Sequence, residues 1–264
     1  SAISFSLAGF AEVENLTLTG SANVDGTGNG LNNSLIGNGG NNVLNGGAGS
    51  DTMTGGAGSD TYIVDSAGDS IVDSSGTESV QSSITFNLSA FAGLEHLTLT
   101  GAGDINGTGS SSSNVLTGND GNNVLDGQGN ADTLIGGDGN DTIIGGAGND
   151  RFDGGLGADA LNFGQNKDTA VFTSLLEAGD IVTGFGTSGS NQDFINLDGL
   201  FDGLGVAAGA RAGRVTLIAA GADTQLWIDS DGDTVADVQL LTFIGISAGL
   251  TVGTAATSDI QVGS

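Results

Sequence analysis

A nine-residue repeat in fixed phase constrains this chain more than any other feature of its sequence. Copies begin at Gly28 and continue to about residue 72, and a second block runs from Gly109 to about residue 168. A fixed short period indicates a solenoid. One apolar residue, at position eight, stands between polar or variable neighbours, which predicts a three-residue strand with one inward side chain and a six-residue turn. The position-eight residues are Leu35, Leu44, Met53, Tyr62, Leu116, Leu125, Leu134, Ile143, Phe152 and Leu161.

Position six of the repeat supplies a series of oxygen donors. Gly at positions one, two and four permits a tight turn that directs backbone carbonyl groups into a shared space. The short side chain of Asp at position six then places its carboxylate beside these carbonyl groups. Oxygen donors in flexible geometry suit Ca²⁺ better than Zn²⁺ or copper, so we predict several calcium ions. The candidate ligands are Asn33, Asn42, Asp51, Asp60, Asn114, Asn123, Asp132, Asp141, Asp150 and Asp159, together with Asp69 and Asp168 from weaker copies.

The charge balance supports an external cation. The 264 residues include 31 acidic and 4 basic residues, giving a net charge of -27, and neither Lys nor Arg occurs before Arg151. Stacked carboxylates about 5 Å apart would repel one another without cations. The strict phase argues against a Gly-rich linker, the polyanion excludes nucleic acid as a partner, and the absence of Cys excludes disulfides and thiolate sites.

The nonapeptides resemble the RTX (repeats-in-toxin) consensus Gly-Gly-x-Gly-x-Asp-x-U-x, clearest in GGDGNDTII (136–144) and GGAGNDRFD (145–153). The resemblance implies an all-β parallel β-roll with a C-terminal β-rich cap. With two nonapeptides in each coil, an ion would lie between residues such as Asp51 and Asp69. The other expected pairs are Asp132 with Asp150, Asp141 with Asp159, and Asp150 with Asp168. Because an Asn offers only its amide oxygen, we expect weaker sites where Asn33 faces Asp51 and Asn123 faces Asp141.

A longer repeat has an offset of 81 residues, since Glu14 to Gly20 match Glu95 to Gly101. The first copy begins in mid-unit, so we expect a fragment of a longer protein. The short strand-like runs in 76–101 are either wider coils of the solenoid or a small sheet packed against it. We divide the chain into 1–108 (first block with intervening strands), 109–170 (second block) and 171–264 (cap and export signal).

The C-terminal third shows a different composition with longer strand-like runs. Residues 179–200 resemble the module that follows RTX repeats in secreted proteases and lipases, and the resemblance implies an uncleaved type I export signal in 244–264. Four acids stand at offsets one, three, five and nine of a loop like that of an EF-hand: Asp229, Asp231, Asp233 and Asp237. Thr234 and Leu240 replace the Gly and Glu of that loop, so an ion site and a plain hairpin turn both remain open.

These features predict a calcium-binding module that folds on extracellular Ca²⁺ and supports type I secretion of a larger protein. The expected partners are calcium ions, the type I machinery at the C-terminus, and cell-surface or self-assembly contacts. The alternatives are a surface-layer or adhesin repeat, and the accessory tail of a secreted lyase, epimerase, lipase or protease. We expect no enzyme activity, since HExxH and GxSxG are absent and His96 is the single His. No apolar run approaches the roughly 18 residues of a membrane span, and the first residues show no signal peptide.

Overall fold

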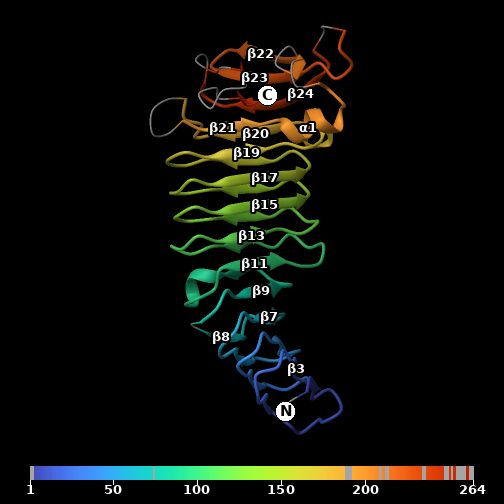
Figure 1. Ribbon diagram of the computed structural model, residues 1–264, viewed down its shortest axis with the longest axis vertical. Coiled ribbons are helices and arrows are strands. Elements are labelled where there is room, and N and C mark those ends of the chain that lie inside the picture. The colour runs from blue at the N-terminus through green and yellow to red at the C-terminus, as the bar shows by residue number, and fades with distance from the viewer. Residues whose placement is uncertain are drawn as a thin grey trace.

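The computed structural model describes residues 3–261 apart from 74, 188–191, 208–209, 212–213, 234–235, 247–249, 251 and 254–259. The protein is an all-β parallel solenoid, drawn in Figure 1 as a stack of coils, which confirms the predicted β-roll. The named helical elements are α1 (Asp198–Gly203) and two 3₁₀ turns, η1 (Leu88–Ala90) and η2 (Leu175–Glu177). No described helix is long and apolar enough to cross a membrane.

Three sheets form the walls of the solenoid. The first contains, in spatial order, β1 (Phe5–Ser6), β3 (Gly26–Thr27), β5 (Val43–Asn45), β7 (Thr61–Val64), β9 (Ser79–Ser82), β11 (His96–Leu99), β13 (Val115–Thr117), β15 (Thr133–Asp138), β17 (Arg151–Leu156), β19 (Thr169–Val171), β21 (Phe194–Asn196), β26 (Ile260–Gln261) and β25 (Val252–Gly253). The second contains β10 (Phe86–Asn87), β12 (Gly107–Thr108), β14 (Val124–Asp126), β16 (Thr142–Ile144), β18 (Ala160–Asn162), β20 (Asp180–Thr183), β24 (Val238–Phe243), β23 (Asp223–Ile228) and β22 (Val215–Ala220). The third contains β2 (Asn15–Thr17), β4 (Ser34–Ile36), β6 (Thr52–Thr54) and β8 (Ser70–Val72).

The pairing register shows that two nonapeptides make one coil. Thr133 pairs with Arg151 on one wall, and Thr142 pairs with Ala160 on the other. Each pair is separated by 18 positions, which is twice the repeat length. Position-six residues of alternate repeats therefore lie above one another.

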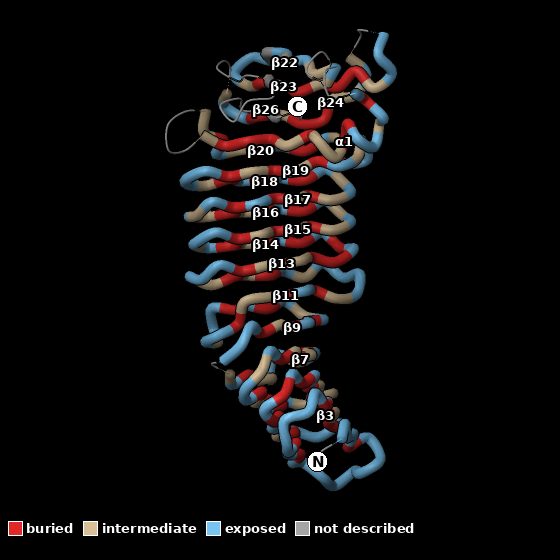
Figure 2. The backbone as a smooth tube through the Cα atoms, in the orientation of Figure 1, coloured by how far each residue is buried: buried red, intermediate tan, exposed pale blue. Residues whose placement is uncertain are grey.

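The core lies between the walls and is lined by position-eight side chains from both of them. All ten of these side chains have exposed fractions of 1% or less, and Figure 2 shows the buried stretches inside the walls. Aromatic rings extend this core toward the C-terminus, where Phe152 stacks on Phe163 with ring centroids 4.6 Å apart. The predicted pattern of one inward residue per strand is confirmed, because a three-residue strand has one central side chain facing the interior.

The segments between and after the repeats extend the same solenoid. Strands β9, β10 and β11 pair with their neighbours in parallel, so 76–101 forms wider coils and not a separate sheet. Strands β20 and β21, where longer strands were expected, are short and parallel to the coil strands before them. Of the expected longer strands, β22 is six residues long, and it forms an antiparallel arrangement with β23 and β24, which also have six residues each. The three-part division of the chain stays a prediction.

Candidate metal centre

The position-six carboxylates form hydrogen-bonded columns along the solenoid. In each column, one carboxylate oxygen accepts the backbone N–H of the position-six residue one coil earlier. Asp150 Oδ1 accepts from Asp132 N at 2.9 Å, and Asp168 Oδ1 accepts from Asp150 N at 2.7 Å. Asp159 Oδ1 accepts from Asp141 N at 2.8 Å. The structure thus brings together the pairs that the repeat predicted, because each strand begins directly after its position-six residue.

The second oxygen of each of these carboxylates has no hydrogen-bond partner. These oxygens are buried as well as unpaired within the described residues, and the parent side chains are at most 3% exposed. A buried carboxylate oxygen without a donor is costly, and such a group normally binds a metal or is paired. The unpaired atoms in the repeats are Oδ2 of Asp51, Asp60, Asp132, Asp141, Asp150, Asp159 and Asp168.

Backbone carbonyls lie beside the unpaired oxygens. A Cβ added at Gly136 would overlap both Asp141 Oδ2 and the carbonyl oxygen of Gly154 in the next coil. Gly at position one is therefore required by close packing, and it leaves a carboxylate and a carbonyl oxygen side by side. Oxygen atoms of these two kinds are the ligands that Ca²⁺ takes in proteins.

Burial raises the pKa of these carboxyls in the metal-free fold. The pKa rises to about 7 for Asp132, to about 6 for Asp141 and to about 8 for Asp168. The hydrogen bond from the preceding coil lowers each pKa, but it reaches only one of the two oxygens, so desolvation dominates. A cation beside the second oxygen would favour the charged form.

The leading coils of each block use amides in place of carboxylates. Asn123 Oδ1 accepts from Asn119 N at 2.8 Å, and its Nδ2 donates to the Ile105 carbonyl at 2.7 Å and to Asn119 Oδ1 at 2.9 Å. The amide hydrogens thus donate to one acceptor in the same turn and one in the preceding coil, without any ion. The ligand role of Asn33, Asn42, Asn114 and Asn123 stays a prediction, and these contacts are a reason for weak binding there.

Asp69 differs from the other predicted acids. Its Oδ1 accepts from Asp51 N at 3.0 Å, and its Oδ2 accepts from Asp65 N and Ser66 N at 3.3 and 3.2 Å. Both oxygens are therefore hydrogen-bonded, because the turn before β8 closes over the carboxylate.

Four acids outside the predicted ligand set continue the columns. Glu78 Oε2 accepts from Asp60 N at 2.6 Å, and Glu95 Oε2 accepts from Glu78 N at 2.7 Å. Asp180 and Asp193 accept from Asp159 N and Asp168 N, both at 2.8 Å. Asp180 and Asp193 were missed because coil lengths change there, with separations of 21 and 25 residues from their partners. Glu78 stands 18 residues after Asp60 and was missed because it is Glu where the consensus has Asp. An acid at the start of a strand or directly before it was the available signal.

The loop like that of an EF-hand gathers three of its four predicted acids. Carboxylate oxygens of Asp229, Asp231 and Asp237 lie within 4.8 Å of one another. Arg214 lies 3.7 Å from Asp229 Oδ1, and Ser230 N and Oγ donate to Asp237 Oδ2 at 2.9 and 2.7 Å. Asp233 is outside this group, and Thr234 lies outside the described residues. An ion site here stays a prediction beside the alternative of a hydrogen-bonded turn.

Substitutions in one column should distinguish the role of the carboxylates, which is to bind an ion, from that of the amides, which is to hydrogen-bond the turn. Asp141→Asn removes an unpaired anionic oxygen, so we expect calorimetric titration with calcium to show about one fewer bound ion per chain. Asn123→Ala removes amide hydrogen bonds, so we expect lower stability toward urea, by about 1–3 kcal/mol, with the ion number unchanged. Loss of an ion in Asn123→Ala would instead make that amide a full ligand.

The stability of the calcium-free fold should fall as the pH rises from about 4 to about 8. Unfolded Asp has a pKa of about 3.9, and burial raises the folded pKa of Asp168 and Asp180 to about 8. The stabilisation is therefore complete below the unfolded value and lost as pH rises through the folded value. The folded fraction in EDTA, measured by the β-sheet signal in circular dichroism across this range, reports the effect. A folded fraction that increases with pH would contradict it.

The comparisons with known proteins agree with this geometry. The family model of the RTX calcium-binding nonapeptide repeat matches four times, at residues 27–62, 108–143, 126–161 and 135–170. No curated protein matches the chain. The matched segments contain all of the position-six Asp residues whose second carboxylate oxygen is unpaired. The chain thus carries RTX calcium-binding nonapeptide repeats at 27–62 and 108–170, wound into a parallel β-roll.

Proposed function

We propose that the protein is a calcium-responsive folding module of an exported protein. The observation that carries this proposal is the set of buried carboxylates, each with one oxygen lacking a hydrogen-bond partner. The calcium-binding repeat is the established part, and folding on Ca²⁺ and export by the type I route are the proposed parts. The RTX β-roll is a structural repeat domain, so we assign ion binding to it and no catalysis.

The chain itself supplies few counter-charges for these carboxylates. Neither Lys nor Arg occurs before Arg151, although the acids of the columns begin at Asp51, 100 residues earlier. The ion pairs of Arg211 and Arg214 involve Asp198, Asp202 and Asp229, which lie after the repeats. Calcium would offset two charges per ion and would bind the folded coils alone, so its binding free energy would add to folding.

The expected calcium affinity would leave the chain without ions in the cytosol and load it outside the cell. Extracellular calcium modules have dissociation constants of about 10⁻⁴–10⁻³ M, so ions would be absent in a cytosol that is low in calcium. An unfolded chain suits passage through an export channel, and folding would follow outside the cell. We therefore propose a secreted location. The proposed export signal, 244–264, falls largely outside the described residues.

Calcium should convert the chain from a largely unfolded state to the β-roll. We expect the circular dichroism spectrum in EDTA to gain a β-sheet signal on addition of millimolar CaCl₂. MgCl₂ at the same concentration is the control, because Mg²⁺ demands near-octahedral coordination and dehydrates reluctantly. Equal β-sheet content in EDTA and in calcium would reject calcium-dependent folding.

The 81-residue repeat favours a second candidate, a repeat of a surface-layer or adhesin protein. Phe5 pairs with Gly26 in the first copy, and Phe86 pairs with Gly107 in the second, so both copies form coils in the same register. Each copy therefore lengthens the same stack, as a spacer or lattice element requires. An accessory tail of a secreted enzyme remains an alternative that no feature of the structure favours.

Calcium-dependent self-assembly would distinguish this second candidate. We expect dynamic light scattering to show growth beyond the monomer size in millimolar calcium, reversed by EDTA, if the stack is a lattice element. A chain that folds with calcium but stays monomeric at all protein concentrations tested would support the folding module alone.

A further inference from the structure

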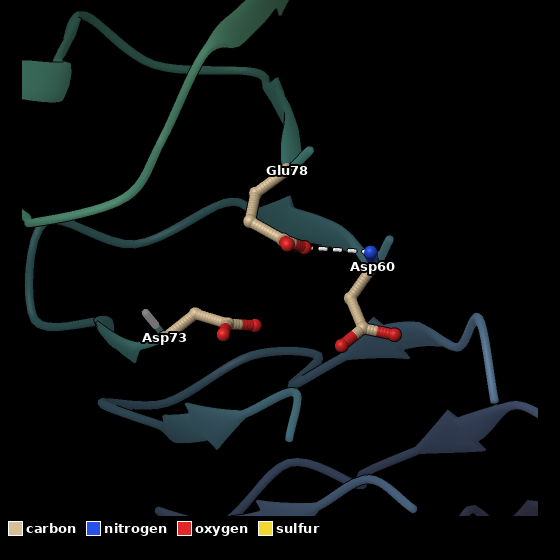
Figure 3. Close-up of side chains that lie close together, drawn as sticks. All are labelled: Asp60, Asp73 and Glu78. Carbon is tan, nitrogen blue, oxygen red and sulfur yellow. Dashed lines mark hydrogen bonds between the residues drawn. The ribbon is translucent and has the colours of Figure 1, made fainter. Parts of the chain in front are cut away.

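Three carboxylates from successive strands meet where the first nonapeptide block ends. Asp60, Asp73 and Glu78 each place a carboxylate oxygen within 4.8 Å of the others, and Figure 3 shows them facing a common space. Asp73 and Glu78 lie outside the matched nonapeptides at 27–62 and 108–170. Glu78 stands 18 residues after Asp60 and continues its column. Asp73 stands 18 residues after Gly55, at the place that the repeat gives to Gly. This group, the junction cluster, therefore has a set of acids that the repeat consensus does not define.

The solenoid itself builds the junction cluster. Asp60 directly precedes β7 and Glu78 directly precedes β9, and these strands pair with Thr61 opposite Ser79. Asp73 directly follows β8, the last strand of the four-stranded sheet. The cluster thus joins the two walls at the point where one sheet ends and, after β9, the nine-stranded sheet begins at β10.

Two of these side chains are buried with an oxygen that lacks a hydrogen-bond partner. Asp60 is 1% exposed and Glu78 is 0% exposed. Glu78 Oε2 accepts from Asp60 N, whereas Glu78 Oε1 and Asp60 Oδ2 have no partner in the described structure. Buried anionic oxygens aimed at one another require a cation or a proton.

Tyr62 contributes a fourth oxygen to the same space. Its hydroxyl donates to Asp73 Oδ2, and its ring is fully buried in the core. A Cβ added at Gly55 would overlap Tyr62 Oη, Asp60 Oδ2 and Asp73 Oδ2 together. Three oxygens therefore converge on one glycine, and a side chain at position 55 would fill the space between them.

We propose that Asp60, Asp73 and Glu78 bind one divalent cation, with Ca²⁺ as the fitting ion, which fastens β8 to β7 and β9. An all-oxygen set with three carboxylates suits Ca²⁺, and higher ligand charge gives higher affinity. Burial raises the pKa of Glu78 to about 7, as expected for a carboxyl lacking its counter-ion. The site rests on the proposed calcium binding of the columns and goes beyond it, because Asp73 supplies a third carboxylate that the repeat consensus lacks.

Terbium luminescence can test the junction cluster, since Tb³⁺ takes oxygen ligands as Ca²⁺ does and emits when a nearby aromatic ring is excited. Tyr62 is the only Tyr and Trp227 the only Trp. In a Trp227→Phe background, we expect Tb³⁺ emission sensitised by Tyr62 and displaced by calcium. Asp73→Asn and Glu78→Gln should each raise the half-saturating terbium concentration about tenfold or more. Asp120→Asn, an exposed acid in the second block, is the charge-matched control and should change nothing.

The outcomes separate this site from the nonapeptide sites. If the half-saturating terbium concentration were unchanged in both Asp73→Asn and Glu78→Gln, the proposal would be overturned and the emission would be assigned to an ion at Asp60 alone. A chain that gains β-sheet signal with calcium but shows no Tyr62-sensitised emission would overturn this site and leave the proposed function standing. If either variant fails to fold, an anomalous terbium peak among the three carboxylates in crystals of the unsubstituted chain supports the site, and its absence at saturating terbium rejects it.

Discussion

The structure depends on one arrangement, a buried carboxylate that is only half satisfied. One oxygen accepts a backbone N–H from the preceding coil, as Asp150 does from Asp132, and this bond fixes the stacking of successive turns. The other oxygen is buried and has no donor. Removing an anion from water without full pairing opposes folding, so the same residue that aligns the coils also makes the metal-free coil unfavourable. Calcium binding to the repeat would resolve this conflict.

The chain uses two chemical solutions for the same turn. Where position six is Asn, as at Asn123, amide hydrogens donate to an amide oxygen of the turn and a carbonyl oxygen of the preceding coil, and no ion is needed to satisfy them. Where it is Asp, as at Asp141, those hydrogens are missing and an anionic oxygen remains. The Asn coils begin each block and the Asp coils follow. The blocks thus start with turns that are satisfied internally and continue with turns that require a cation.

Sequence reasoning reached the coil and its core but not every member of the acid columns. The nine-residue phase located Leu134 and Phe152 in the core and Asp132 above Asp150, because a strict period places equivalent residues at equivalent heights. Asp180 and Asp193 escaped it, since their coils are longer and a fixed period cannot follow changes in loop length. The runs at β20 and β21 were expected to be longer strands, yet they pair in parallel with β18 and β19 and continue the solenoid.

The sequence by itself determined the repeat length, the inward residue of each strand and the kind of ion that the turns can hold. These properties are local, because they follow from Gly, Asp and one apolar side chain at fixed spacing. The tertiary structure decided which oxygens are left unpaired and which distant acids meet. Asp60 and Glu78 occupy equivalent positions in successive coils, but Asp73 does not, and only the winding of β7, β8 and β9 brings all three together. No local pattern specifies burial, and because Asp60 and Glu78 are buried, their negative charges require a cation.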